Sequence, residues 1–193
     1  MNKLTISTIN CQGQTKITLG KQLQIQNYIV QYKIDILFCQ ETYINDDTFE
    51  NCSNIKDNYN IISNNTQNEY GTLTLVKNSI EIKDIAVDTE GRIIIFNSGE
   101  TTFVNVYPKS GTDVESRRER ELMFSNTIPN MLLHRKKNLV IGGDWNAITD
   151  NLDATHYPEA KTSPTLRRLI NMLEIKDCHR KNIVLCFSLL YSI

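Results

Sequence analysis

The chain has 193 residues, of which 40% are hydrophobic and 22% are charged, and it contains only 8 Gly and 4 Pro. This composition is typical of a globular domain with a sizeable core, and it excludes collagen-like and compositionally disordered chains. Lys and Arg total 21 against 22 Asp and Glu, a net charge of −1, so any contact with a nucleic acid must come from a local patch.

Predicted strands and helices alternate in the first half of the chain. Residues 4–10 are β-rich and residues 34–39 read as a buried strand. Between them a helix is expected, because four residues share one helical face: Ile25, Tyr28, Ile29 and Tyr32. Residues 45–68 are rich in Asn, Asp and Ser and are predicted to be mostly loop, with a short strand at 59–63. Residues 71–77 then alternate apolar and polar side chains.

Three β-rich runs follow at residues 80–87, 92–97 and 101–107, and the Gly-containing turns between them predict an antiparallel meander. Residues 138–142 form a continuous apolar strand. Because strands outnumber helices and interleave with them, the pattern favours a layered α/β sandwich as a single domain.

Two helices are predicted in the second half. Residues 115–133 form a charged helix that Pro129 should end or kink. Its candidate core contacts are Leu122, Phe124, Ile128 and Leu132. The last helix has Ser163 as its cap and Pro164 in its first position. Its apolar face consists of Leu166, Leu169, Ile170 and Leu173.

Five cysteines are scattered through the chain, an odd number with no C-x-x-C pair: Cys11, Cys39, Cys52, Cys178 and Cys186. This pattern argues against a disulfide framework and a structural zinc site, and it favours a reducing compartment. The first residues lack the apolar run and cleavage site of a secretory signal. The longest apolar stretch, residues 183–193, is shorter than the roughly 20 residues that cross a membrane. An intracellular location without a transmembrane segment is therefore expected.

Polar residues gather where predicted strands end. Asn10 ends the first strand, Gln40 and Glu41 follow the second, Tyr107 ends a later one, and residues 143–146 (GDWN) follow the apolar strand at 138–142. Taken singly, each has an ordinary structural explanation as a turn former, a solvated acid or a strand aromatic. Together, four such strand ends could meet along one edge of a sandwich.

Four short strings occur in the order of the signature segments of the endonuclease/exonuclease/phosphatase superfamily: residues 9–13 (INCQG), 39–42 (CQET), 104–107 (VNVY) and 142–146 (GGDWN). More narrowly, the chain resembles the apurinic-type endonuclease domain of non-LTR retrotransposons. That branch is suggested by VNVYPKSG, which precedes the Arg-rich residues 116–121, and by GGDWN, which precedes Asp153. The resemblance runs from about Leu4 to about Arg180.

The resemblance implies a four-layered α/β sandwich, with two packed and mainly antiparallel sheets flanked by helices, that is incomplete at the C-terminus. It also implies Mg²⁺-dependent nicking of DNA, with Mn²⁺ as a possible substitute and no organic cofactor. Carboxylates and amides suit this chemistry, because phosphodiester hydrolysis needs a hard cation, a positioned water and donors to the phosphate oxygens. A DNA substrate would in turn imply a nuclear location.

The resemblance also implies a role for each candidate residue. Glu41 would hold the metal, with Asn10 beside it as a direct or indirect oxygen ligand. Asp144 would orient or deprotonate the attacking water. Asn146 would donate to the scissile phosphate, and the Tyr107 hydroxyl would stabilise the developing negative charge.

The sequence departs from the family near its end. A later strand with a further active-site Asp and a terminal Ser-Asp-His string are both missing, and none of the three histidines follows an Asp: His134, His156 and His179. We therefore expect residues 1–182 to be a partial domain, residues 183–193 to be an unrelated apolar tail, and activity to be impaired. Two alternatives stay open: a non-catalytic remnant or nucleic-acid-binding module, and a phosphatase of the same superfamily acting on a lipid or inositol phosphate.

The basic clusters have two interpretations each. Arg117, Arg118 and Arg120 interleave with glutamates, so they could form helix-surface ion pairs or touch phosphates. Residues 134–137 (HRKK) could contact a DNA backbone or form a solvated face, and the same holds for three later cations: Lys161, Arg167 and Arg168.

Overall fold

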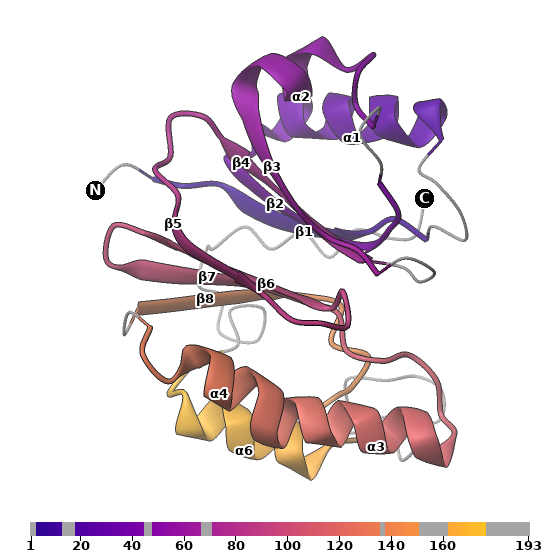
Figure 1. Ribbon diagram of the computed structural model, residues 1–193, viewed down its shortest axis with the longest axis vertical. Helices are drawn as coiled ribbons and strands as arrows, with labels where there is room; N and C mark the ends of the chain where they lie inside the picture. Colours follow the sequence, from indigo (N-terminus) through magenta and orange to yellow (C-terminus); the bar gives the residue numbers. More distant parts are fainter. Residues whose placement is uncertain are drawn as a thin grey trace.

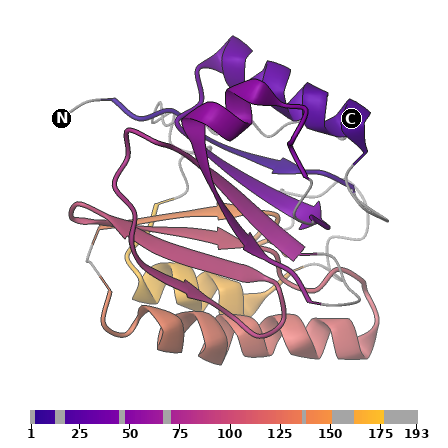
Figure 2. The same cartoon turned by 45° about the horizontal axis from the view of Figure 1, so that its top comes forward.

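A computed structural model describes residues 3–12, 18–44, 48–66, 71–135, 138–150 and 162–176. Two four-stranded sheets pack face to face, and helices cover the outer face of each sheet (Figure 1). The turned view keeps the same order, with α1 and α2 above one sheet and α3, α4 and α6 below the other (Figure 2). The predicted four-layered α/β sandwich is thereby confirmed. Several predictions fall outside the described residues, namely those on the 183–193 tail, Lys136, Lys137, Asp153, His156, Lys161, Cys178, His179 and Cys186.

The first sheet has the strand order β1-β2-β4-β3. Its strands are β1 (Ile6–Asn10), β2 (Ile36–Thr42), β3 (Tyr59–Asn64) and β4 (Gly71–Lys77). β1 and β2 run parallel, whereas β4 pairs antiparallel with both β2 and β3. β4 is buried along almost its whole length despite its alternating sequence, because it lies inside the sheet between a helical layer and the second sheet.

The second sheet has the order β5-β6-β7-β8. Its strands are β5 (Lys83–Val87), β6 (Ile93–Ser98), β7 (Thr101–Val106) and β8 (Asn138–Gly143). β5, β6 and β7 form the predicted antiparallel meander, and β8 adds to β7 in parallel. As a result, the carboxyl ends of β7 and β8 lie together, as do those of β1 and β2.

Two helices cover the first sheet. In α1 (Leu19–Tyr32), Ile25, Tyr28 and Ile29 are buried as predicted, but Tyr32 is 52% exposed. Its ring instead lies against the Tyr28 ring, with 4.9 Å between the ring centres and 54° between the ring planes. The second helix, α2 (Ser53–Asn58), lies in the segment predicted to be mostly loop. This helix buries one apolar side chain, Ile55, and so carries no amphipathic repeat for a sequence pattern to reveal.

Three helical segments cover the second sheet. α3 (Val114–Leu122) continues into a π-helical turn (Met123–Thr127) and then α4 (Ile128–Leu132). The chain therefore does not end its helix at Pro129. The N–H of Ile128 bonds to the carbonyl of Met123, five residues back, and this wider turn just before Pro129 accommodates the ring, which would clash in a regular helix interior.

One core prediction in this helical stretch is wrong, at the last residue of α3. Phe124, Ile128 and Leu132 are buried as expected, but Leu122 is 56% exposed. Residues two apart lie on nearly opposite sides of a helix, so the burial of Phe124 leaves Leu122 outside, and Met123 packs against the sheet instead.

The last described helix, α6 (Pro164–Met172), begins as predicted: Ser163 Oγ accepts a hydrogen bond from the N–H of Leu166 at 3.0 Å, with Pro164 in the first turn. Leu166 and Leu169 are buried, and Ile170 and Leu173 are partly buried against the same core. None of the described helices has the length and apolar character to cross a membrane.

The space between the sheets changes character along the strands. At one end it is apolar, filled by a cluster of Ile6, Ile36, Phe38, Ile62, Val76, Ile94, Phe96 and Phe103. Further along the same strand faces, polar side chains take over: Thr8, Gln40, Thr74 and Asn105. The polar end opens at the carboxyl ends of β1, β2, β7 and β8.

Candidate active site

The four strand ends singled out in the sequence meet at the polar end of the sandwich. Asn10 and Tyr107 each donate a hydrogen bond to Glu41, and Asn10 donates a further bond to Asp144. Asn146 joins through its backbone N–H, which donates to Asp144 Oδ1 at 3.1 Å. The structure thus brings all five predicted site residues together, from both sheets.

Asn10 lies at the centre of this arrangement. Its amide nitrogen donates to Glu41 Oε1 at 2.9 Å and to Asp144 Oδ2 at 2.8 Å, while its oxygen accepts from the N–H of Gln12 at 2.8 Å. The opposite amide orientation would turn the oxygen toward two carboxylates and lose the Gln12 bond, so the network determines it. Asn10 therefore holds together two carboxylates that would otherwise repel each other.

Glu41 reaches the site through an irregularity in β2. Strict alternation would place Glu41 on the α1 side, because the preceding Gln40 faces the second sheet and bonds to Asn105 there. The register of β2 against β4 shifts between Gln40 and Thr42, and Glu41 has a left-handed φ of 54°. A bulge of this kind re-aims a side chain, and here it turns the carboxylate toward Asn10 and Tyr107.

Tyr107 follows β7 and is only 3% exposed. Its hydroxyl donates to Glu41 Oε1 at 3.1 Å. Burial, and then the charge and hydrogen bond of Glu41, raise the pKa of Tyr107 well above its ordinary value of 10. The phenol is therefore a protonated donor at neutral pH.

Arg92 packs against Tyr107. Its guanidinium lies 5.2 Å from the centre of the Tyr107 ring, and its Nη1 donates to the Tyr107 carbonyl at 3.2 Å. The Arg92 charge acts on the Tyr107 pKa in the opposite direction to Glu41, as a smaller effect. Arg92 has no distinguishing pattern in the sequence, because it is a lone Arg directly before a strand.

The turn after β8 positions Asp144 and Asn146. Gly143 adopts φ 141°, and a Cβ at this position would lie 1.9 Å from the carbonyl oxygen of its β7 partner Val106. A glycine is therefore required where β8 passes into the turn. Asn146 has φ 47°, and its side-chain nitrogen donates to the Pro108 carbonyl at 3.0 Å.

The loop that follows Tyr107 is organised by Arg120 from α3. This side chain is 3% exposed, and its Nη1 donates to the carbonyls of Lys109 and Gly111, each at 2.8 Å. Arg120 thus matches neither predicted interpretation, surface ion pair or phosphate contact. Arg118 does form an exposed ion pair with Glu115 at 3.9 Å, and Arg117 donates to the Thr112 carbonyl.

The donor set suits a hard divalent cation. Glu41 and Asp144 present carboxylate oxygens around one amide nitrogen, and Glu41 Oε2 has no hydrogen-bond partner among the described residues. Mg²⁺ is typically bound through one or two carboxylates and retained waters. No group of three His, Cys, Asp or Glu side chains lies together as a metal site in the described part of the chain. A cation here would therefore be bound by one or two carboxylates and by several waters.

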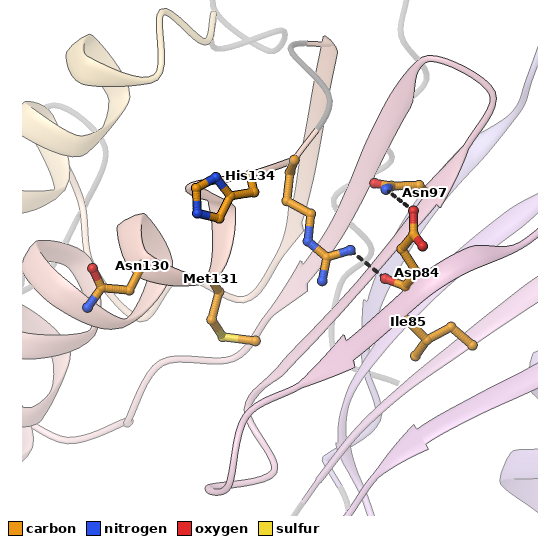
Figure 3. Close-up of a pocket in the computed structure, with 7 residues that line it drawn as sticks. Asp84, Ile85, Asn97, Asn130, Met131 and His134 are labelled. Atoms are coloured by element: carbon orange, nitrogen blue, oxygen red, sulfur yellow. Dashed lines mark hydrogen bonds between the residues drawn. The ribbon is translucent and has the colours of Figure 1, made fainter.

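A separate hollow of about 600 Å³ lies elsewhere, between β5, β6 and the end of α4 (Figure 3). It includes His134 and Arg135, and Arg135 donates to the Asp84 carbonyl. Asn97 lines this hollow and pairs with Thr102 near the start of β7. The candidate site lies at the opposite end of β7. His134 is therefore remote from the site. Arg167, from the other basic cluster, donates to the Thr149 carbonyl.

Three cysteines, Cys11, Cys39 and Cys52, are free and buried. Burial, with the neighbouring Cys11 thiol, raises the pKa of the Cys39 thiol. These thiols act as small apolar side chains in the core beneath α1 and α2.

The sequence model of the Endonuclease/Exonuclease/phosphatase family matches residues 7–168. No curated protein sequence matches the chain. Similar solved structures include an AP endonuclease from Archaeoglobus fulgidus, with a TM-score of 0.69 and 16% identity, covering 89% of this chain and 70% of that one. The 3′ phosphatase NExo from Neisseria, bound to product DNA hairpin, gives a TM-score of 0.66 at 18% identity. This match covers 89% of this chain and 70% of that one. TDP2 from C. elegans gives a TM-score of 0.59 at 18% identity, and the match covers 81% of this chain and 51% of that one.

At these identities, the structural likeness establishes a shared fold. The family match spans more than half of the sequence and includes every residue of the site. The chain therefore belongs to the Endonuclease/Exonuclease/phosphatase family.

Proposed function

We propose that this chain is a divalent-metal-dependent endonuclease that nicks DNA, of the apurinic type found in non-LTR retrotransposons. The observation that carries the proposal is the convergence of the Glu41 and Asp144 carboxylates on the Asn10 amide, with the Tyr107 hydroxyl on the same Glu41 oxygen. Two carboxylates, two amides and a phenol supply what phosphodiester hydrolysis requires: a cation site, a base and donors.

Glu41 would hold the cation, Mg²⁺ or Mn²⁺, with Asn10 keeping its carboxylate oriented. When bound, the ion would neutralise the negative charge that builds on the phosphate. Asp144, fixed by Asn10 and by the N–H of Asn146, would orient a water and accept its proton. Asn10 thus keeps the cation ligand and the base at a set separation.

Asn146 and Tyr107 would act on the phosphate oxygens. The Asn146 amide, held through the Pro108 carbonyl, is placed as a donor beside the base. The raised pKa of Tyr107 keeps its hydroxyl protonated, so it can donate to a developing negative charge.

DNA is the proposed substrate because similar folds include an AP endonuclease and a 3′ phosphatase bound to a DNA hairpin. We expect slow turnover. No histidine joins the site among the described residues, and the 193 residues contain no Ser-Asp-His string. The loss of one preorganised donor typically lowers the rate by about 10²–10³-fold. A DNA substrate would favour a nuclear location.

The test is the nicking of supercoiled plasmid by the purified chain with Mg²⁺. Asp144→Asn should reduce nicking by about 10²–10⁴-fold, because it removes the proposed base while preserving shape. Asp84→Asn, at the hollow away from the site, is the matched control and should nick at the wild-type rate. Wild-type nicking that equals that of Asp144→Asn, or that persists with EDTA, would overturn the proposal.

A 3′-phosphorylated duplex, tested in parallel, addresses phosphatase activity on a DNA end, and an inositol phosphate addresses the alternative substrate considered from the sequence. One structural neighbour is a 3′ phosphatase, and release of inorganic phosphate without strand cleavage would favour that activity. Release that is abolished by Asp144→Asn would assign the same residues to a phosphomonoester substrate.

A further inference from the structure

Two buried amides lie directly behind the proposed site. Gln40, in β2 of the first sheet, is 1% exposed, and Asn105, in β7 of the second sheet, is fully buried. Gln40 Nε2 donates to Asn105 Oδ1 at 2.8 Å. We call these residues the inter-sheet amide pair. Such a bond is unusual in its setting, since the neighbouring positions on the same faces, Phe38 and Phe103, are apolar.

The rest of the amide pair is also hydrogen-bonded. Asn105 Nδ2 lies 2.9 Å from the Leu73 carbonyl and 3.2 Å from Thr74 Oγ1, both in β4, and 3.3 Å from the Cys39 carbonyl in β2. Thr8 Oγ1, in β1, donates to Gln40 Oε1 at 3.1 Å. Asn105 therefore connects β7 to the first sheet through a set of directional bonds that no apolar side chain could reproduce.

The pair lies close in sequence to the two side chains that must meet across the sheets. Gln40 precedes Glu41, and Asn105 lies two residues before Tyr107. Apolar packing permits sliding of one sheet over the other, whereas directional bonds fix the relative position of β2 and β7. The 3.1 Å bond between Tyr107 and Glu41 depends on that relative position.

We infer that Gln40 and Asn105 are positioning residues, which hold Glu41 of the first sheet and Tyr107 of the second in their reactive arrangement. The inference rests on the proposed function for its effect on rate. It makes a separate claim about geometry, which can be measured without any substrate.

The experiment compares Asn105→Leu, Gln40→Met and the double variant that carries both changes. Each single variant leaves one buried amide without its partner and should lower the thermal midpoint by about 3–10 °C. The double variant replaces both amides by apolar groups of similar shape and should regain part of that stability, since Thr8 and Thr74 still lose their bonds to the pair. Thr8→Val, which removes only the outer bond to Gln40, is a milder variant that should fold in any case.

Nicking distinguishes positioning from mere stability. A misplacement of about 1 Å can cost about 10²-fold in rate, so both single variants and the restabilised double variant should lose about 10–100-fold in kcat with little change in KM. The matched control is Phe103→Leu, on the same face of β7, which should lower the midpoint and keep kcat. If the double variant regained activity along with stability, the positioning role would be wrong.

The side-chain amide signal of Asn10 in a ¹⁵N NMR spectrum, assigned with Asn10→Asp, provides the readout that does not need activity. It should move in Asn105→Leu and in the double variant, and stay in place in Phe103→Leu. A signal that stays in place in all of them overturns the positioning role. A wild-type protein that fails to nick, while the signal moves as expected, overturns the proposed function alone.

Discussion

The two ends of the space between the sheets are built on the same strands, but one end is apolar and the other is polar. At one end, Phe96 and Phe103 stack at 5.1 Å between their centroids inside an apolar cluster. At the other, β7 continues through Asn105 to Tyr107, and hydrogen bonds join these two side chains to Gln40 and Glu41 of the first sheet. The apolar end stabilises the fold through buried area, whereas the polar end places charged and hydrogen-bonding groups for chemistry.

Along the strand direction, the sandwich therefore has the contacts that stabilise the fold at one end and the proposed reactive groups at the other. Dispersion and hydrophobic contacts tolerate small shifts of one sheet on the other. Hydrogen bonds to buried groups do not, because a lost partner leaves an unsatisfied polar atom. We therefore expect substitutions at the two ends to separate stability from activity.

The largest effect on stability is expected at the apolar end. Phe96→Ala removes a fully buried ring that stacks on Phe103, and it should lower the free energy of unfolding by about 3–5 kcal/mol. Nicking per folded molecule should stay at the wild-type level, because Phe96 is remote from Asp144. Urea unfolding and nicking at 10 °C measure the two quantities. A fall in rate beyond the unfolded fraction would mean that the two ends are coupled.

A smaller loss of stability, with loss of activity, is expected for Gly143→Ala. The added Cβ would lie 1.9 Å from the Val106 carbonyl oxygen at a φ of 141°, so the turn must shift at a cost of about 2–4 kcal/mol. Because Asp144 is the next residue, nicking should fall as well.

Gly99→Ala is the matched control for this variant. Gly99 has φ 54° with nothing within 4 Å of the added Cβ, and it lies in the β6–β7 turn at the other end of β7. Its replacement should cost only about 1–2 kcal/mol and leave nicking unchanged. Equal losses of activity in the two variants would show that placement of Asp144 does not depend on this glycine.

The smallest effect concerns alkaline pH. Below pH 10, Tyr107 is protonated in the folded and unfolded chains, so its contribution to stability is complete. Because burial and Glu41 raise the pKa of Tyr107 in the folded state, the unfolded chain releases its proton first above pH 10, and stability falls as pH rises. Tyr107→Phe should make the free energy of unfolding decline less steeply between pH 10 and 11.

The control is Tyr32→Phe, at a half-exposed ring on α1, which should keep the wild-type pH dependence. Urea unfolding at each pH gives the slopes. If Tyr107→Phe had the wild-type slope, the phenol would be neither buried nor paired with Glu41 in solution as it is here.

Much of this architecture follows from local patterns in the sequence. Ser163 and Pro164 mark the start of α6 because capping and a missing N–H are properties of single residues. The meander of β5, β6 and β7 follows from short apolar runs with glycine turns between them. α2 escapes such patterns, since one buried Ile55 produces no periodicity.

The residues that make up the site could be predicted from the sequence, but their arrangement in space could not. The ordered strings around Asn10, Glu41 and Asp144 identify the residues, but the bulge that turns Glu41 depends on pairing with β4, far away in sequence. Asn105 did leave a signal, as a polar residue in an apolar strand. Arg120 left none, because a buried Arg that bonds loop carbonyls has the same sequence context as one in a surface ion pair.

The π-helical turn at Met123–Thr127 bears on how related sequences should be aligned. It amounts to one extra residue absorbed inside a helix, which rotates everything after it by about 100° relative to an uninterrupted helix. An alignment across this segment should therefore treat α3 and α4 as two helical stretches, each with its own phase. Insertions and deletions among relatives should thus be sought within this helix as well as in loops, with Pro129 as the marker of the longer form.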